Sequence, residues 1–587
     1  MDKDRVVEVL EEIGTLLELK GENPFKTRAY STAARVLETL PESLDRVVAE
    51  GRLAELKGIG SALQQKITEL VTTGRLAYYE ELRASVPAGL LDLLTIPGLG
   101  PKKAKALHDA LEVTSIEQLE TACREGRVAG LAGFGAKTQA KILEGIQFRR
   151  EHDSQHLLVE ALAVAEPMLE GLRTHPRVIQ CSLAGSLRRW KEVVGDLDFV
   201  VSSKAPGEVL DYFTGQPEVS KVLARGETKA SILTRSGVQA DLRVVTDAEF
   251  PFALAYFTGS KEHNIVMRQR AITRGLRLNE YGLFRSAEET RDPALRMACR
   301  TEEELFHHLE LSYIPPELRE DQGEFDAAER DALPRLVDWT DLKGSLHNHS
   351  TWSDGRQSLE EIAAHAQELG CAYWAVTDHS RSSFVANGLD ERRLREQLKA
   401  LSAINDAFAA EGNTFRLLSG SEVDILADGR LDFPDELLAG LDVVVASIHQ
   451  GFSQDEAVMT RRLIQAAGNP HVHMLGHLTG RLLLEREGYR VNQTAVIDAC
   501  ADRGTWIELN ANPRRLDLDW RLWAYAKSRG VRCVINCDAH RAEHAGFLRL
   551  GACLARKGWL TKADVINTRS LEELRGLLRS RRSGRKG

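Results

Sequence analysis

In the C-terminal half of this chain, short apolar β-like runs repeatedly end in a histidine or a carboxylate, and no other feature of the sequence constrains the fold as much. After residue 338, such runs alternate with amphipathic helical stretches, which is typical of a β/α domain. Seven runs have this form. Because the carboxyl ends of parallel strands gather at one face of a β/α barrel, the sequence predicts a distorted seven-stranded barrel with one site at that face.

The residues at these strand ends form a set of imidazole and carboxylate ligands. His347 and His349 are two residues apart on one run and therefore share a face of the strand. A single buried histidine is more often a satisfied core residue than a ligand, but a whole set at strand ends is not explained in that way. Imidazole with carboxylate suits Zn²⁺, Mn²⁺ or Fe²⁺ better than Ca²⁺. The predicted metal ligands are His347, His349, Asp354, His379, Glu422, His449, His477, Asp538 and His540.

A second set of carboxylates lies in the first half of the chain. Asp196 and Asp198 are two apart on a β-like run, so both point to one face, and Asp241 lies on a further run, VQADLRVV. Paired carboxylates on one face are electrostatically costly unless a cation lies between them. Three carboxylates on adjacent strands can hold two Mg²⁺ ions for in-line phosphoryl transfer.

A small turn with positive charge precedes this pair of aspartates. Gly185 and Ser186, followed by Arg188 and Arg189, supply charge-assisted donors that suit a polyphosphate. A bare Asp-x-Asp pair is common in soluble proteins. Gly-Ser followed by Gly-Asp-x-Asp and a later strand aspartate is far more specific.

Residues 1–150 are expected to be mostly helical, and one local motif occurs there three times. An apolar residue and Gly-apolar-Gly precede a polar helix start in LKGIGSALQQKI, IPGLGPKKAKAL and LAGFGAKTQAKIL. Such a turn leaves helix N–H groups free for a phosphate oxygen. One copy alone is usually only a helix connection, but three copies resemble helix-hairpin-helix motifs, which hold the DNA backbone without reading sequence. The glycines concerned are Gly58, Gly60, Gly98, Gly100, Gly133 and Gly135.

Composition limits the class of protein. Of 587 residues, 43% are hydrophobic and 28% are charged, which is typical of a soluble globular chain with several domains. We expect neither a membrane helix nor a secretory signal, because no apolar stretch is long enough and the N-terminus is charged and amphipathic. The net charge of −9 gives no argument for nucleic acid. Eight cysteines without a CxxC pair favour a reducing cytoplasm.

Taken together, the motifs resemble those of known families. The segments GSLRR…GDLDF, YFTGSKEHNIVMR (256–268) and LNEYG (278–282) resemble a family X DNA polymerase over about residues 1–315. The histidine–carboxylate set resembles a PHP (polymerase and histidinol phosphatase) domain over about residues 340–575. A polymerase head of this kind fused to a complete PHP domain is the arrangement of bacterial family X DNA polymerases.

The resemblance implies a multidomain α/β fold. Its expected parts are a lyase-like helical domain with the first hairpin (1–82), fingers with two further hairpins (83–150), a nucleotidyltransferase palm with a mixed β-sheet (151–252), a thumb (253–315) and the PHP barrel (338–575). The charged, proline-bounded segment 316–337 is interpreted as a linker, with a surface helix as the alternative. The tail, 576–587, is basic, and residues 579–587 of it are expected to be disordered.

The resemblance also implies residue roles. Asp196, Asp198 and Asp241 would be catalytic metal ligands, and the third could accept the proton of the 3′-hydroxyl. Arg268 would contact the template. The implied nucleotide-binding residues are Gly185, Ser186, Arg189, Tyr256, Phe257, Gly259 and Asn264. For Tyr256 and Phe257, ordinary core packing is the alternative.

Two positions depart from the family pattern. Lys66 falls where the family's lyases carry their Schiff-base lysine, but Ala62 stands where a second lysine is common. Gln239, two residues before Asp241, replaces an arginine that is common in the animal enzymes. The first departure bears on deoxyribose-phosphate lyase activity, and the second on proton transfer at Asp241.

The function implied is gap-filling DNA synthesis in short-patch base excision repair, with a 3′→5′ exonuclease and also AP-endonuclease or 3′-phosphatase action at the PHP site. The expected cofactors are two Mg²⁺ or Mn²⁺ ions in the palm and up to three Mn²⁺ or Zn²⁺ ions in the PHP domain. Gapped or primer–template DNA and dNTPs are the expected partners of a cytoplasmic monomer. The alternatives are a PHP phosphoesterase or nuclease with a weak or vestigial polymerase head, and a non-catalytic scaffold that binds gapped DNA.

Overall fold

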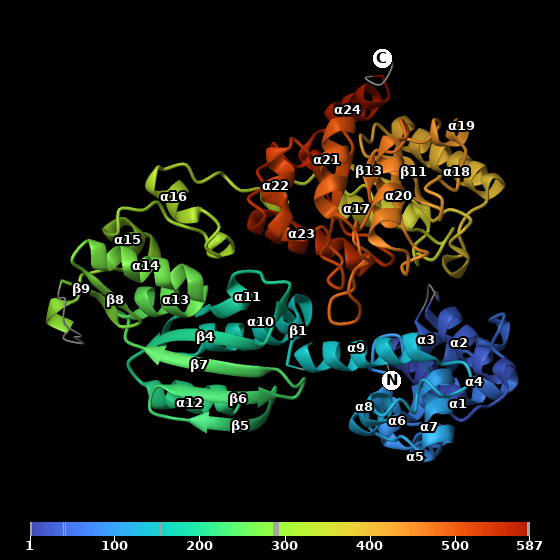
Figure 1. The fold of residues 1–587 in the computed structure, drawn as a ribbon, viewed down its shortest axis with the longest axis horizontal. Coiled ribbons are helices and arrows are strands. Elements are labelled where there is room, and N and C mark those ends of the chain that lie inside the picture. The colour runs from blue at the N-terminus through green and yellow to red at the C-terminus, as the bar shows by residue number, and fades with distance from the viewer. Residues whose placement is uncertain (1–2, 39, 41–42, 153, 286–292, 584–587) are drawn as a thin grey trace. The chain divides into compact units, whose positions relative to one another are not determined.

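The computed structural model describes residues 3–38, 40, 43–152, 154–285 and 293–583, and the chain divides into two compact units after residue 153 (Figure 1). Each unit has its own hydrophobic core. Among the described residues, the helices all fall short of the length and apolar character that crossing a bilayer requires.

The N-terminal unit is helical throughout its described residues (Figure 1). Val6, Leu10, Ile13 and Leu17 recur at helical spacing and are almost completely buried, so the apolar stripe of the first helix faces the core. The helices are α1 (Lys3–Leu19), α2 (Pro24–Glu38), α3 (Leu44–Ala49), η1 (Arg52–Glu55), α4 (Ser61–Thr73), α5 (Ala77–Ala84), α6 (Ala88–Leu93), α7 (Pro101–Leu111), α8 (Ile116–Arg124) and α9 (Ala136–His152).

The three Gly-x-Gly motifs lie in turns directly before helices, as predicted. Gly60 caps α4, Gly100 caps α7, and Gly135 immediately precedes α9. Gly98 has φ of 79°, a left-handed conformation that favours glycine, and a Cβ built on it would meet no atom within 4 Å. The turns therefore leave room for a ligand to approach the backbone.

The second unit begins with a mixed five-stranded sheet, in the order β2-β4-β7-β6-β5. β4 and β7 are parallel and the other neighbouring pairs are antiparallel. Alternate residues of β7, such as Ala240, Leu242 and Val244, are buried, so the other face of that strand is free for a site. The elements are β1 (His156–Leu157), α10 (Leu158–Thr174), β2 (Val178–Leu183), α11 (Gly185–Arg188), β3 (Val193–Val194), β4 (Asp196–Ser203), α12 (Pro206–Thr214), β5 (Val219–Arg225), β6 (Lys229–Thr234) and β7 (Gln239–Val245).

A helical region with a small hairpin follows this sheet and has a hydrophobic core of its own. Its elements are α13 (Phe250–Thr258), α14 (Lys261–Thr273), β8 (Arg277–Asn279), β9 (Gly282–Phe284), η2 (Pro293–Leu295), α15 (Glu302–His308), η3 (Pro316–Leu318) and α16 (Glu324–Glu329).

The segment 316–337, interpreted above as a linker, is packed rather than free. Leu318, Phe325, Ala328 and Leu336 belong to the same core as α15, and the side chain of Arg319 is fully buried. The high charge of the segment suggested solvent exposure, and several of its charged residues are exposed, but Arg319 and Glu324 are buried with partners, Glu302 and His263 respectively. The linker interpretation is therefore wrong for most of this segment.

The C-terminal domain is built on a parallel six-stranded sheet in the sequential order β10 to β15. The remaining one of the seven predicted runs, residues 343–349, comes first in the sequence and is not a regular strand. Its backbone nevertheless hydrogen-bonds to both ends of this sheet. Ala375 N–H donates to Ser345 O (2.9 Å) on the β10 side, and His349 N–H donates to Ala539 O (2.8 Å) beyond β15. The run thus takes the place of the seventh strand of the distorted barrel. The strands are β10 (Tyr373–Val376), β11 (Arg416–Asp424), β12 (Val443–Ser447), β13 (Met474–Leu475), β14 (Trp506–Asn510) and β15 (Cys533–Asn536).

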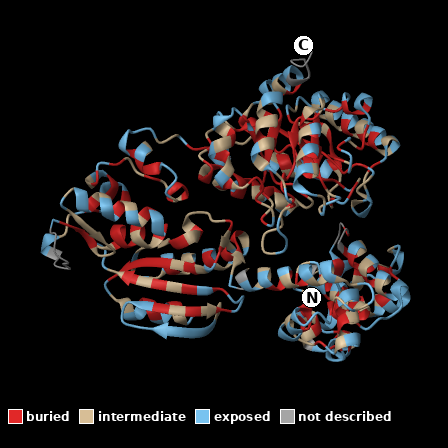
Figure 2. Ribbon diagram, viewed as in Figure 1, coloured by how far each residue is buried: buried red, intermediate tan, exposed pale blue. Residues whose placement is uncertain are grey.

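Helices cover this sheet, and Figure 2 shows its strands buried while the surrounding helices carry exposed residues. The helices are η4 (Trp339–Asp341), α17 (Leu359–Glu368), η5 (Phe384–Ala386), α18 (Glu391–Ala410), α19 (Asp435–Leu438), α20 (Glu456–Gly468), α21 (Gln493–Arg503), η6 (Trp520–Leu522), α22 (Trp523–Ser528), η7 (Ala542–Gly546), α23 (Phe547–Lys557), η8 (Ile566–Thr568) and α24 (Leu571–Ser583).

The C-terminal tail also differs from the prediction of disorder. Residues 576–583 continue α24, and residues 584–587 lie outside the described part of the chain. Leu574 and Leu578, one helical turn apart, are buried against the base of the sheet. The prediction of disorder rested on the basic residues of this segment and did not take into account the two leucines at helical spacing.

A buried ion pair network joins the palm to the helical region that follows it. Glu302 is 5% exposed and accepts hydrogen bonds from Arg188 Nη2 (2.5 Å) and Arg319 Nη1 (2.7 Å). Burial raises the pKa of Glu302, but the two guanidinium groups outweigh burial and lower the pKa to about 2. The carboxylate therefore stays ionised at every pH at which the protein is expected to be folded.

Replacing Glu302 by glutamine should destabilise the second unit by about 3–5 kcal/mol at pH 7, because two arginines lose their buried partner. The pKa of Glu302 is lower in the folded protein than the ordinary value of 4.5, so its ionised form stabilises the fold at pH values above 4.5. This contribution is lost as the pH falls toward 2. Denaturant unfolding should show that the difference in unfolding free energy between the wild type and E302Q is smaller at about pH 3 than at pH 7. The control is Glu303→Gln, an exposed neighbour on the same helix. Equal unfolding midpoints for E302Q and E303Q at pH 7 would contradict the assignment.

Two candidate metal centres

The first candidate site is the carboxylate cluster on the mixed sheet. Asp198 on β4 is the register partner of Asp241 on the parallel strand β7, and Asp196 lies two residues before Asp198 on the same face. Ligand oxygens of the three side chains lie within 4.8 Å of one another. The predicted triad is therefore brought together by the pairing of two parallel strands.

Gly185 allows the turn before α11 to approach this cluster. It has φ of 61°, and a Cβ built on it would lie 2.1 Å from Asp198 Oδ2. No side chain fits in that space without moving Asp198. The glycine of the predicted Gly-Ser turn is thus required by close packing against a ligand.

The electrostatics of the carboxylate cluster favour a bound cation. Burial, and then the charges of Asp196 and Asp241, raise the pKa of Asp198 to about 7, although Arg189 acts in the opposite direction. Burial and the charge of Asp241 also raise the pKa of Asp196. Crowded carboxylates of this kind are stabilised by divalent cations, so the residues fit the two ions that the resemblance implies.

Neutral groups hold Asp241 in place. Ser231 Oγ donates to Asp241 Oδ1, and Gln239 Nε2 donates to Oδ2 (2.9 Å). Gln239 therefore orients the carboxylate without adding a positive charge.

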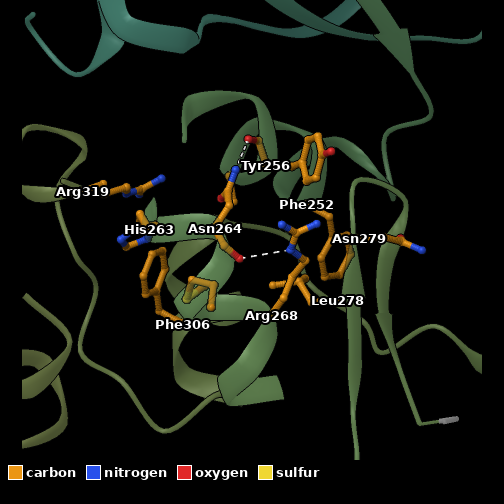
Figure 3. Close-up of a pocket in the computed structure, with 11 residues that line it drawn as sticks. Phe252, Tyr256, His263, Asn264, Arg268, Leu278, Asn279, Phe306 and Arg319 are labelled. Carbon is orange, nitrogen blue, oxygen red and sulfur yellow. Dashed lines mark hydrogen bonds between the residues drawn. The ribbon is translucent and has the colours of Figure 1, made fainter. Parts of the chain in front are cut away.

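Three predicted nucleotide residues, Tyr256, Phe257 and Asn264, and the predicted template contact, Arg268, line two depressions. Tyr256, Asn264 and Arg268 line one cavity, where Asn264 Nδ2 donates to Tyr256 O (2.7 Å) and Arg268 Nε donates to Asn264 O (3.2 Å) (Figure 3). Phe257 instead lines a second depression together with Asp198, Asp241 and Arg243. Tyr256 and Phe257 are only partly buried, and Phe257 packs against the hydrophobic cluster around Phe250.

The second candidate site collects all nine predicted ligands of the C-terminal domain. Side chains from separate strand ends meet there, and Glu422 on β11 lies at the centre, with its Oε1 2.8 Å from His477 Nε2 and 3.3 Å from His449 Nε2. His349 Nε2 lies 3.1 Å from Asp538 Oδ1. Three overlapping groups have metal-ligand spacing, namely His349–Asp354–His379–His540, His347–His349–Glu422 and His379–Glu422–His449.

Several buried atoms of this cluster have no hydrogen-bond partner among the described residues. They include His347 Nε2, His349 Nδ1 and His477 Nδ1. Buried polar atoms without a partner are costly, and native proteins rarely keep them without an ion or water. Imidazole and carboxylate together suit Mn²⁺ or Zn²⁺, so the residues fit metal ions in this cluster.

Charge coupling within the cluster is strong. Burial lowers the pKa of His347, but the carboxylates of Glu508, Glu422 and Asp538 outweigh burial and raise the pKa well above its ordinary value. Burial raises the pKa of Glu422, but the surrounding histidines, His449 first, lower it well below its ordinary value. The carboxylates are thus ionised and available as ligands.

Glu508 is a supporting residue that the sequence analysis missed. It is fully buried, and its Oε1 lies 2.7 Å from His347 Nδ1 while its Oε2 accepts from His477 N–H (2.7 Å). An ionised carboxylate only accepts, so Nδ1 carries the proton and Nε2 is left to bind a cation. Strand β14 ends in Asn510, which is not a strong metal ligand, and Glu508 lies two residues earlier on the same strand face.

Asp424 is a second residue of this kind. His449 Nδ1 and Ser382 Oγ both donate to Asp424 Oδ atoms, which fixes the ring of His449. Asp424 follows the ligand Glu422 by two residues on β11, so the two-residue period of a strand could have identified it.

Four family models match parts of the chain. They are the helix-hairpin-helix domain (residues 1–76), the SAM-like helix-hairpin-helix tandem (90–147), the DNA polymerase beta thumb (253–320) and the PHP domain (345–512). Among curated proteins, the DNA polymerase/3′-5′ exonuclease PolX of Bacillus subtilis is 40% identical over 99% of this chain and 100% of its own length. The chain belongs to the PolX family.

Weaker similarities cover parts of this PolX chain. The probable phosphatase TTE1963 of Caldanaerobacter subterraneus subsp. tengcongensis is 29% identical over 28% of this chain and 66% of its own length. A crystal structure of Leishmania infantum polymerase beta, a ternary complex, aligns with 22% identity and a TM-score of 0.27 over 40% of this chain and 99% of the other. The matched thumb and PHP models, with the full-length PolX relative, confirm a family X polymerase region joined to a PHP domain.

In the absence of divalent cations, Asp198→Asn should remove a pH-dependent loss of stability. A carboxyl group whose folded pKa is raised to about 7 from 3.8 stabilises the fold fully only below 3.8, and this contribution is lost as the pH rises through 7. The loss amounts to at most about 4 kcal/mol. Urea unfolding of both proteins in chelator at about pH 5 and pH 7 measures it. Identical pH slopes for wild type and D198N would contradict the raised pKa.

Glu508→Gln should weaken metal binding in the PHP domain by about 10- to 100-fold, because glutamine is uncharged and has one acceptor oxygen where Glu508 has two, so either His347 Nδ1–H or His477 N–H loses its acceptor. Calorimetric titration with Mn²⁺ measures the affinity directly, without reference to activity. Glu485→Gln, a change at a partly exposed ion pair with Arg514, is the matched control. An unchanged Mn²⁺ affinity in E508Q would show that Glu508 does not support the ligands.

Proposed function

We propose that this chain is a DNA repair polymerase that adds dNMPs to a primer 3′-end in short gaps and also removes nucleotides from 3′-ends at its PHP site. One observation carries the proposal above all others. A chain that matches a PolX protein from end to end holds both a complete palm triad and a complete set of nine PHP ligands, each gathered in space.

In the palm, Asp196, Asp198 and Asp241 would hold two Mg²⁺ or Mn²⁺ ions, which supply Lewis-acid charge to a 3′-hydroxyl and a pyrophosphate leaving group. Asp241 takes the hydroxyl proton, because Ser231 and Gln239 hold its carboxylate without neutralising it. The turn at Gly185 and Ser186 brings backbone and hydroxyl donors to the triphosphate. Transfer then takes place in line, with pyrophosphate leaving.

The rest of the nucleotide is held by the cavity of Figure 3. Asn264 is fixed by its bond to Tyr256 O and presents its side chain to the base, while Tyr256 and Phe257 lie against the sugar. Arg268, which is exposed on α14 and donates to Asn264 O, contacts the template strand. A ribose 2′-hydroxyl would meet the aromatic pair, so dNTPs are the preferred substrates.

In the PHP domain, the nine ligands would hold up to three Mn²⁺ or Zn²⁺ ions that activate water for phosphoester cleavage. Arg515 adds a positive charge at this site, since its Nε lies 3.6 Å from Asp538 Oδ2 and its side chain is 20% exposed. A guanidinium in this place suits the scissile phosphate. Glu508 and Asp424 keep the histidine rings oriented during turnover.

The helical N-terminal unit binds the DNA backbone. Its three hairpins present helix N-termini at Gly60, Gly100 and Gly135, where N–H groups and the helix dipole attract phosphate oxygens. Such contacts hold gapped DNA without reading its sequence.

Deoxyribose-phosphate lyase action at Lys66 stays a prediction. The ammonium group of Lys66 lies 4.5 Å from the ring centroid of Tyr78 and 5.9 Å from that of Tyr30. These aromatic rings hold the lysine in place as a cation–π partner. Trapping with borohydride on an incised abasic substrate tests whether it forms a Schiff base.

Two single variants should separate the two activities. On a labelled one-nucleotide gapped duplex with Mn²⁺, Asp196→Ala should reduce dNMP addition by about 10³-fold and leave 3′→5′ trimming intact. His349→Ala should reduce trimming by about 100-fold or more and leave dNMP addition intact. The measurement is a time course with and without dNTP. Loss of both activities from either change in a folded protein would argue against two independent sites.

A 3′-phosphatase is the second candidate activity of the PHP site, favoured by the similarity of this region to a probable phosphatase. The same assay with a 3′-phosphorylated primer distinguishes it. Release of inorganic phosphate that H349A abolishes would assign this activity to the PHP cluster, whereas release that survives in H349A would exclude it.

A further inference from the structure

A buried lysine of the PHP domain reaches the back of the nucleotide turn of the palm. Lys557, the last residue of α23, has a fully buried side chain, and its Nζ donates to Glu320 Oε1 (2.5 Å) and to Arg189 O (3.1 Å). The lysine also lies 4.4 Å from the ring centroid of Trp520. Lys557 and Arg189 are 368 residues apart in the sequence.

The partner of this lysine is shared with the predicted triphosphate ligand. Arg189 Nε donates to the same Glu320 Oε1 (3.1 Å), and Arg189 Nη1 donates to Thr258 O. Lys191 Nζ approaches the other oxygen of Glu320 (3.9 Å). The carboxylate of Glu320 is thus shared by Lys557, Arg189 and Lys191, so it compensates the charge of none of them completely.

The position of Arg189 makes this sharing relevant to the polymerase site. Its charge acts on the metal ligand Asp198, and a Cβ on Gly259 would lie only 3.0 Å from its Nη1. Its side chain is 11% exposed, so its geometry is set by the surrounding protein rather than by solvent. A small change in the partners of Arg189 therefore changes how far its positive charge, next to the triphosphate, is compensated by Glu320.

Further contacts fix the same two segments to the PHP domain. Glu192 accepts from Trp520 Nε1 (3.0 Å) and from Arg521 Nη1 (2.9 Å), and Arg556 Nε donates to Glu317 (2.6 Å). The residues contacted flank the nucleotide turn on one side and Glu320 on the other. The PHP domain is thus built against the polymerase site, within the second compact unit of the chain.

We propose that Lys557 is a positioning residue of the polymerase reaction. By binding Glu320, it leaves the positive charge of Arg189 available to the triphosphate of the incoming dNTP, and by binding Arg189 O it fixes the nucleotide turn. A hydrolytic domain thereby sets the nucleotide affinity of the polymerase head. This inference rests on the proposed function, since it assigns Arg189 to the triphosphate.

The test measures kcat and KM for dNTP on a one-nucleotide gapped duplex, using the full chain. Lys557→Met keeps the length of the side chain and removes its charge, so Glu320 pairs fully with Arg189. KM should rise about tenfold, equivalent to about 1.4 kcal/mol, with kcat nearly unchanged. Exonuclease action on the same DNA should not change. Lys557→Arg should keep KM within about twofold of the wild type.

The double variant K557M/E320Q separates charge sharing from a merely structural role. Without the carboxylate, Arg189 keeps its charge, so KM should return toward the wild-type value although the buried lysine is still missing. The matched control is Lys562→Met, which removes a partly exposed lysine paired with Asp341 from the same domain. K562M should leave both activities unchanged.

Three outcomes would overturn the inference: an unchanged KM in K557M, a raised KM that E320Q does not lower, or an equal loss of both activities in a folded K557M protein. If K557M unfolds below the assay temperature, the E320Q variant is used to test charge sharing. A raised KM in E320Q contradicts charge sharing, and an unchanged or lower KM supports it. A wild-type chain that adds no dNMP would instead refute the proposed function.

Discussion

The cost of crowding ionisable side chains away from water is the constraint on which both sites depend. In the palm, three carboxylates lie together and the pKa of Asp198 rises to about 7. In the PHP domain, imidazole nitrogens such as His347 Nε2 are buried without a partner among the described residues. Neither arrangement is favourable for the chain alone, and each becomes favourable with divalent cations. The same cations carry the chemistry, so the unfavourable packing and the function have one origin.

Parallel strand pairing is how the chain achieves this crowding. The register of β4 with β7 places Asp198 beside Asp241, and the consecutive strands of the PHP sheet place their ends around Glu422. A side chain at a strand end needs only the correct face and the correct end to enter such a cluster. For that reason, the two-residue period and the strand ends predicted from the sequence which of these side chains gather in space.

The same rule explains what the sequence analysis missed. Glu508 and Asp424 each contact the Nδ1 atom of a histidine, and the two-residue period of a strand does not distinguish such a supporting carboxylate from one that faces the centre of the cluster. The linker interpretation of the segment 316–337 was wrong for a different reason. Its charge suggested solvent, yet Arg319 and Glu324 are buried because partners elsewhere in the fold neutralise them. Pairing across long sequence distances has no local signal.

The contact between Lys557 and Arg189 is the extreme case of such pairing, because its members belong to different domains. A buried lysine is stable only where carboxylate and carbonyl oxygens surround it, so the PHP helix α23 and the segment around Glu320 must fit each other closely. Fusion of the two domains therefore does more than bring two activities to one DNA end. Because the polymerase turn is completed by a side chain of the hydrolytic domain, selection on nucleotide binding also acts on that domain, and the two can diverge only together.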